Sequence, residues 1–278
     1  MDIFQAFVLG LVEGLTEYLP VSSTGHLLLA QRLMGIPSSD AADAFAICIQ
    51  AGAILAVLGL YRKRVGDMAA GVLGRNPAGF RLATAILSAF IPAAVLGFIL
   101  EKTIKKYLFG GDEWGLWPVV AAWFVGGVAI LAVAFWKRRQ RSEKPGLSLD
   151  DLTIRMALIV GIAQCLAMWP GVSRSLITIV GGLLVGLSLP AAVELSFLLG
   201  VLTLTAATAY DALRHGSVML AEFGPVNLAV GFVAAWISAV LAVKWMVGYL
   251  NKHGMEIFGW YRVALAIAVA IWLVTTGG

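Results

Sequence analysis

Long apolar segments alternate with short polar or basic ones along most of this chain. A helix rises 1.5 Å per residue, so about 20 apolar residues cross the roughly 30 Å hydrocarbon core of a bilayer. Six segments have this length and character, which predicts six membrane-spanning helices. They cover residues 43–61, 80–100, 115–136, 191–213, 226–250 and 257–275.

Two further apolar segments are interrupted by proline. Pro20 breaks the first, and Pro170 followed by Gly171 breaks the second. Proline cannot donate the backbone hydrogen bond and clashes with the preceding turn, so a helix ends or kinks there. Serine and threonine, which are good helix N-caps, follow both breaks. Each segment is therefore predicted to form a helix, a turn and a second short helix.

The second half of the sequence repeats the first at an offset of 151 residues. Residues 9–15 align with 160–166, and Val21-Ser22 aligns with Val172-Ser173. Each half contains one broken segment followed by three predicted spans. We therefore expect one membrane domain over 1–278 that consists of two repeats, at about 1–139 and 151–278.

Basic residues indicate how the chain is oriented. They cluster at 62–81 and 137–155, and such loops are typically cytoplasmic. With both loops inside, each broken segment starts and finishes on one side of the membrane, as a re-entrant hairpin. The two hairpins enter from opposite sides, which is an inverted-topology repeat, and both termini lie outside. The irregular tips, at 20–26 and 170–178, must be buried in protein and are expected to meet near the midplane.

The composition supports this interpretation. Of the 278 residues, 60% are hydrophobic and only 13% are charged, whereas soluble domains are about a quarter charged. The predicted fold class is thus an all-α integral membrane protein. The net charge of +4 comes mostly from the loop clusters, so it indicates orientation and does not predict a nucleic-acid partner.

Polar residues with chemical potential gather at the two predicted tips. Helix N-termini offer free amide donors, and Arg174 adds a forked cation suited to phosphate. Glu13 and Glu17 share a helix face, and they would repel a phosphate unless a hard divalent cation, Mg²⁺ or Ca²⁺, lies between. Ser23 lies three residues before His26, which pairs a hydroxyl with a candidate general base. These features predict phosphoryl transfer.

The sequence resembles the bacterial undecaprenyl-diphosphate phosphatase family of the bacitracin-resistance type. The resemblance rests on Glu-x-x-x-Glu before Pro-Val-Ser-Ser-Thr-Gly-His at 20–26, and on Pro-Gly-Val-Ser-Arg-Ser-x-x-Thr at 170–178. It covers nearly the whole chain. It implies hydrolysis of a C55 polyprenyl diphosphate to the monophosphate, at the outer (periplasmic) face of the bacterial inner (plasma) membrane. That reaction recycles the lipid carrier of peptidoglycan synthesis and underlies antibiotic resistance.

The resemblance also implies residue roles. Ser23 matches the nucleophile and His26 its base, while Glu13 and Glu17 match the acidic motif that would bind the cation. Glu17 and Arg174 join the catalytic set. The phosphate-binding residues would be Ser22, Thr24, Gly25, Ser173, Ser175 and Thr178. The implied partners are the polyprenyl diphosphate and membrane lipids, and a homodimer is left open.

Other interpretations of these residues remain open. His26 could itself be the nucleophile, the two glutamates could simply pair with Arg174, and the serines could serve only as helix caps. A polyprenyl-phosphate flippase would use the same inverted repeats and anion site without a nucleophile. The chain also departs from the family pattern at Leu176, Leu189 and 201–206, which bears on substrate fit and rate.

Overall fold

The structure is a computed structural model that describes residues 1–37, 39–104, 115–139 and 146–276. Its secondary structure over these residues is helical, apart from one isolated β-bridge between Leu147 and Leu187. Two short 3₁₀ helices, η2 (Leu149–Asp151) and η3 (Cys165–Met168), flank α7. The α-helices are α1 (Ile3–Thr16), α2 (Ser23–Leu33), α3 (Asp40–Leu60), α4 (Arg62–Val72), α5 (Pro77–Ile104), α6 (Trp117–Arg139), α7 (Ile154–Gln164), α8 (Arg174–Leu184), α9 (Leu189–Leu250) and α10 (Glu256–Thr276).

The predicted all-α membrane protein is confirmed at the level of helix length and composition. Five helical stretches in the described residues are long and apolar enough to cross a membrane. A sixth is obtained if α3 and α4, which meet at a bend of 84°, count as one broken span. Large apolar side chains are exposed on the outer helices, as on a surface that faces lipid; Phe98 on α5 is 75% exposed. The five stretches are Pro77–Leu100, Trp117–Trp136, Leu189–Arg214, Met219–Leu250 and Glu256–Thr276.

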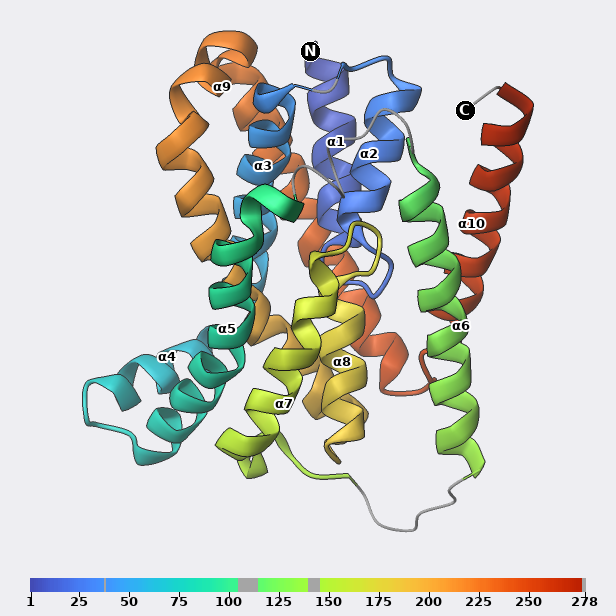
Figure 1. The fold of residues 1–278 in the computed structure, drawn as a ribbon. Coiled ribbons are helices and arrows are strands. Elements are labelled where there is room, and N and C mark those ends of the chain that lie inside the picture. The colour runs from blue at the N-terminus through green and yellow to red at the C-terminus, as the bar shows by residue number, and fades with distance from the viewer. Residues whose placement is uncertain (38, 105–114, 140–145, 277–278) are drawn as a thin grey trace.

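Two predicted loops are in fact helical. The basic segment after residue 61 forms α4, because its apolar residues Val65 and Met68, three apart, pack against the core while Arg62 and Lys63 are exposed. The predicted loop at 214–225 continues α9 up to Gly224. There the backbone adopts φ +70°, and Pro225 follows, so the helix breaks at that point alone. Figure 1 shows α9 reaching one end of the molecule and returning.

Both broken segments form the predicted helical hairpins. Ile3 begins α1 and Ile154 begins α7, 151 residues later; α2 and α8 begin and end at the same offset. Figure 1 shows α1 and α2 at the end of the molecule where the termini lie, and α7 and α8 at the opposite end. The turns of the two hairpins lie at mid-height, between the long helices.

Two glycines at equivalent positions let the hairpins pack closely on long helices. A Cβ atom at Gly10 of α1 would lie 2.2 Å from the carbonyl oxygen of Gly231 in α9. A Cβ atom at Gly161 of α7 would lie 2.3 Å from the carbonyl oxygen of Ala89 in α5. Real atoms do not approach so closely, so only glycine fits at either position. Each hairpin is thus held against a helix from the other half of the chain.

The described parts of the two basic segments lie at one end of the molecule. Arg64 of α4 forms ion pairs of 2.8 Å with Asp150 of η2 and with Glu194 near the start of α9. Figure 1 shows α4 at the end opposite to both termini. This is the arrangement that the distribution of basic residues predicts.

Candidate active site

The two hairpin turns share an unusual backbone conformation. Ser22 has φ +74° and Ser173 has φ +79°, and they are the two residues other than glycine with positive φ in the part of the chain that the structure describes. Each caps the next helix: the Ser22 hydroxyl accepts from the Gly25 amide at 3.4 Å, and the Ser173 hydroxyl from the Leu176 amide at 3.3 Å. Such conformations cost about 1–3 kcal/mol and cluster at functional sites.

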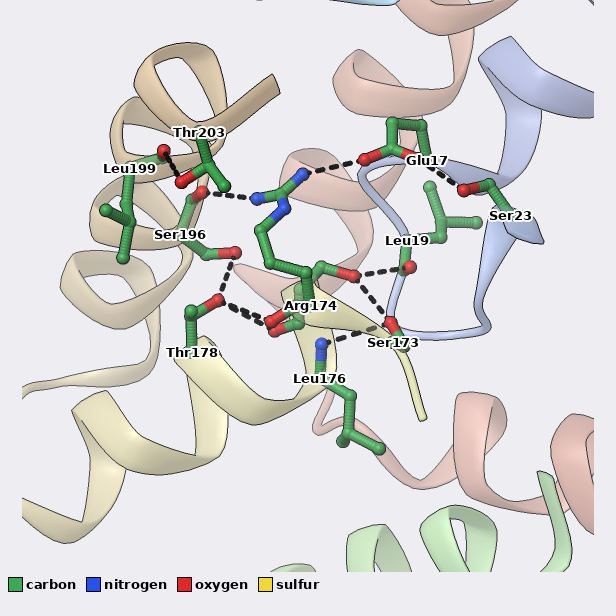
Figure 2. A network of polar contacts seen from close by, with 11 residues as sticks. Glu17, Leu19, Ser23, Ser173, Arg174, Leu176, Thr178, Ser196, Leu199 and Thr203 are labelled. Carbon is green, nitrogen blue, oxygen red and sulfur yellow. Dashed lines mark hydrogen bonds and ion pairs between the residues drawn. The ribbon is translucent and has the colours of Figure 1, made fainter. Parts of the chain in front are cut away.

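Arg174 joins the two hairpins. Its Nη2 donates to Oε1 of Glu17 at 3.0 Å, and its Nη1 donates to the carbonyl oxygen of Ser196 in α9 at 2.8 Å (Figure 2). Its guanidinium also lies over the ring of Tyr18, 5.4 Å from the ring centre. A cation from the second hairpin thus meets an anion from the first. The pairing of a glutamate with Arg174, which was one of the open interpretations, is present in this geometry for Glu17.

Glu17 also accepts a hydrogen bond from Ser23. The Ser23 hydroxyl donates to Oε2 of Glu17, while Oε1 receives Arg174 (Figure 2). One carboxylate therefore orients both the candidate nucleophile and the candidate phosphate-binding cation. It is also placed to take the proton of the Ser23 hydroxyl.

His26 has other partners than the sequence predicted. Its Nδ1 lies 2.7 Å from the carbonyl oxygen of Ser22, and its Nε2 lies 2.8 Å from the hydroxyl of Tyr261 in α10. The Tyr261 ring stacks on the imidazole with an interplanar angle of 7°. Among the described residues, His26 forms no hydrogen bond to Ser23. The predicted hydrogen bond between these two side chains is absent, and the Ser23 hydroxyl donates to Glu17 instead.

Glu13 is buried completely, and neither of its carboxylate oxygens has a hydrogen-bond donor among the described residues. A carboxylate without a partner in an apolar interior is costly, so Glu13 needs a proton or a cation. With Glu17 one turn further on, it supplies the oxygen ligands that Mg²⁺ and Ca²⁺ prefer. No group of three or more acidic, histidine or cysteine side chains that could hold a metal occurs in the described ranges. Glu13 and Glu17 alone offer two carboxylates, so a hard cation held by them would need further oxygen ligands.

A cavity of about 120 Å³ lies where the turns meet. Its polar lining comes from both hairpins and from Gln50 of α3, whose place inside a predicted apolar span already made it a possible lining residue. Most of the predicted site residues line it. They are Glu17, Ser22, Ser23 and Thr24 from the first hairpin, and Ser173 and Arg174 from the second.

Three predicted phosphate-binding residues instead hold the turns in place. The Ser175 hydroxyl donates to the carbonyl oxygen of Leu19 at 2.7 Å. The hydroxyl of Thr178, which is fully buried, lies 2.8 Å from the hydroxyl of Ser196. Gly25 packs against the Trp123 ring, which a Cβ atom would approach to 2.7 Å. None of the three lines the cavity.

Sequence reasoning missed Arg262, which lies in α10 and is completely buried. Its guanidinium donates to the carbonyl oxygen of Gly171 at 2.8 Å and to that of Pro20 at 3.3 Å, so it holds both turns. Its other acceptors are carbonyl oxygens of α6, at Ala122 (2.8 Å) and Trp123 (3.4 Å). An arginine within the apolar stretch 257–275 was the available signal, because such a cation must find acceptors.

Comparisons with known proteins identify relatives of this sequence. The family model described as bacitracin resistance protein BacA matches residues 6–268. An undecaprenyl-diphosphatase of Sorangium cellulosum is 45% identical over 271 residues, which cover 97% of this chain and 86% of the relative. Undecaprenyl-diphosphatase 2 of Rhodospirillum rubrum is 43% identical, with 96% and 93% covered. An undecaprenyl-diphosphatase of Methylococcus capsulatus is 44% identical, with 96% and 94% covered.

Proposed function

This chain belongs to the bacitracin resistance protein BacA family, and from that premise we propose that it is an undecaprenyl-diphosphatase. It hydrolyses undecaprenyl diphosphate to undecaprenyl phosphate and inorganic phosphate. The observation that carries this function is the contact of Glu17 with both Ser23 and Arg174, where two hairpin turns meet. The network combines a nucleophile, a proton acceptor and a phosphate-binding cation.

In the proposed mechanism, the Ser23 oxygen attacks the terminal phosphorus and its proton passes to Glu17. The bond from that phosphorus to the bridging oxygen breaks, and undecaprenyl phosphate leaves. Arg174 and the free amides at the starts of α2 and α8 stabilise charge on the phosphoryl oxygens. As undecaprenyl phosphate leaves, Glu17 passes its proton to the former bridging oxygen. Water then attacks the phosphoserine while the bond between phosphorus and the Ser23 oxygen breaks. Glu17 takes a proton of the water and returns it to the Ser23 oxygen, and inorganic phosphate leaves. His26 as base would first have to leave the Ser22 carbonyl and Tyr261.

Glu13 and Glu17 are the residues that would hold a divalent cation, Mg²⁺ or Ca²⁺. The buried, unpartnered oxygens of Glu13 support this assignment. When bound, such an ion would neutralise charge on the phosphoryl oxygens next to the two carboxylates.

We further propose that the protein lies in the bacterial inner membrane as two inverted repeats, 1–139 and 151–278, each a re-entrant hairpin plus three spans. The common offset of 151 residues between the hairpins, their entry from opposite ends and the shared end of the basic segments support this. The active site would open to the outer, periplasmic face. The described residues of one chain supply the nucleophile, the proton acceptor and the cation of the proposed chemistry.

Purified protein in detergent or liposomes should release inorganic phosphate from undecaprenyl diphosphate, and the Ser23→Ala variant should not. A flippase, which the meeting of hairpins from opposite ends also favours, would move the lipid between leaflets without releasing phosphate. Transbilayer movement with no phosphate released by the parent protein would therefore replace the proposed function.

A further inference from the structure

A second, larger cavity adjoins the site. It measures about 460 Å³ and lies between α5, the α7–η3 segment and the first half of α9. Ala167, Met168, Arg174 and Leu204 line both this groove and the site cavity, so the two spaces meet at Arg174. A molecule whose charged end lies in the site could therefore extend into the groove.

The walls of the groove suit a hydrocarbon chain. Small residues leave room for it along both long helices: Ala94 and Gly97 on α5, and Ala206 and Ala207 on α9. A Cβ atom at Gly97 would lie 3.7 Å from Met168, an ordinary contact distance across the groove. Binding pockets of this volume are typically apolar, with few polar groups that fix the orientation of the ligand.

Two polar groups at the inner part of the groove are buried without partners. Gln164 is only 3% exposed, and neither its amide oxygen nor its amide nitrogen has a hydrogen-bond partner in the described residues. The Nε of Arg174 also lacks an acceptor there. Native proteins rarely leave such groups unsatisfied, so each unpaired group calls for a ligand or a water. Both offer N–H donors, which suit phosphate oxygens.

We infer that this groove seats the part of the isoprenoid chain nearest the diphosphate, with Gln164 and the Nε of Arg174 binding the phosphate attached to that chain. This inference rests on the proposed function and names the substrate-binding surface for it. The ligand has the right shape, with one anionic end and an apolar chain. The phosphate that Gln164 would bind is the one that stays on the lipid after hydrolysis.

A rival groove exists on the other side of the first hairpin. It measures about 470 Å³ and is lined by α1, the second half of α9 and α10. It shares no lining residue with the site cavity, and none of its described lining side chains is a buried polar group without a partner. It therefore lacks the two features that connect the first groove to a diphosphate. It provides a matched control.

Photolabelling of the unmodified protein tests the position of the chain. The probe is a polyprenyl diphosphate analogue with a photoreactive group on its first isoprene unit, with unmodified substrate as competitor. We expect competed labelling on α5 and the first half of α9. Labelling on α10 or the second half of α9, or no competed labelling, would overturn the inference.

Filling each groove tests the same point by kinetics. Ala94→Trp should raise the KM for undecaprenyl diphosphate by about tenfold or more, because a large ring displaces apolar contacts of the chain. Leu241→Trp, in the rival groove, should leave the KM within about twofold of the parent. The reverse pattern, or equal KM values for the two variants, would overturn the proposed groove. Absence of phosphate release by the parent would instead refute the proposed function, and photolabelling would still locate the lipid.

Gln164→Met separates binding from packing. Methionine has a similar length but lacks the amide. If Gln164 binds no ligand, this substitution should therefore cause no loss of stability or activity. We expect the KM to rise about tenfold while kcat stays within about threefold and the melting temperature is unchanged or higher. An unchanged KM would remove Gln164 from the binding site.

Discussion

Glu17 is the residue on which the chemistry of the site depends, because its two oxygens serve different partners. One pairs with Arg174 and the other accepts from Ser23. The placement of the basic loops and the need to bury the irregular hairpin tips were enough to predict that these tips would meet. The spacing of Ser23 and His26 was a poorer guide. Three residues apart, they share a helix face, but the partner of His26 is Tyr261, 235 residues further along the chain.

Arg174→Lys should be far from conservative. Lysine keeps the charge but cannot reach Glu17 and the Ser196 carbonyl with a planar fork. Loss of one charge-assisted hydrogen bond should lower turnover by about ten- to hundredfold while the protein still folds. Phosphate release and the melting temperature check this together; an activity within about twofold of the parent would make Arg174 a structural residue.

The covalent intermediate should form on Ser23. Ser23→Ala should abolish turnover, whereas Ser22→Ala, which removes only the cap of α2, should reduce it. Labelled substrate trapped under acid should leave a phosphoserine, which is stable to acid and labile to base. A phosphohistidine has the opposite stability, and its recovery from His26 would make that residue the nucleophile.

Turnover should depend on a divalent cation if Glu13 and Glu17 hold one. A strong chelator should abolish phosphate release, and added Mg²⁺ or Ca²⁺ should restore it. Glu13→Gln keeps the size but removes a charged ligand, so it should need a higher cation concentration for half-maximal activity. Full activity in the chelator would leave Glu13 buried as a protonated carboxyl.

At the scale of elements, hydropathy predicted the long spans and proline predicted both hairpin turns. The misses have physical causes. The many basic residues of α4 led to the prediction of a loop. The three-residue spacing of Val65 and Met68, which lets a helix pack against the core, was overlooked. The lightly charged segment 214–225 was predicted to be a loop, but the helix breaks there only at Gly224, which Pro225 follows. Nothing local predicts that Arg262 of α10 reaches two turns far away in sequence, because its acceptors are backbone carbonyls, which carry no residue signature.

Removal of the Arg262 side chain should loosen both turns together. Arg262→Met leaves four carbonyl oxygens without their donor, so stability should fall by about 3 kcal/mol or more. Arg75→Met is the matched control, since Arg75 is exposed and its loss should change stability by less than about 0.5 kcal/mol. Melting temperatures in detergent compare the two, and equal values would show that Arg262 does not hold the turns.

At the scale of the whole molecule, the end that carries the basic helix α4 lies opposite to the end that carries both termini (Figure 1). If the basic end is cytoplasmic, a cysteine at Leu73, between α4 and α5, should be labelled only from inside. A cysteine at Asp2 should be labelled from outside by a membrane-impermeant reagent, in a protein whose Cys48 and Cys165 are replaced. Labelling of position 73 from outside, or of position 2 from inside only, would reverse the proposed orientation.

Each hairpin packs closely on a helix of the other half, Gly10 against Gly231 and Gly161 against Ala89. Each half of the chain therefore provides a packing surface that the hairpin of the other half needs. Each hairpin makes this closest backbone approach to a helix of the other half, so the insertion order during synthesis matters. The first hairpin must wait for α9 before its packing surface exists, while the second finds α5 already in place. The early hairpin, with its buried acid and its hydroxyls, is therefore the one exposed to lipid and to quality-control proteases while the ribosome finishes the chain.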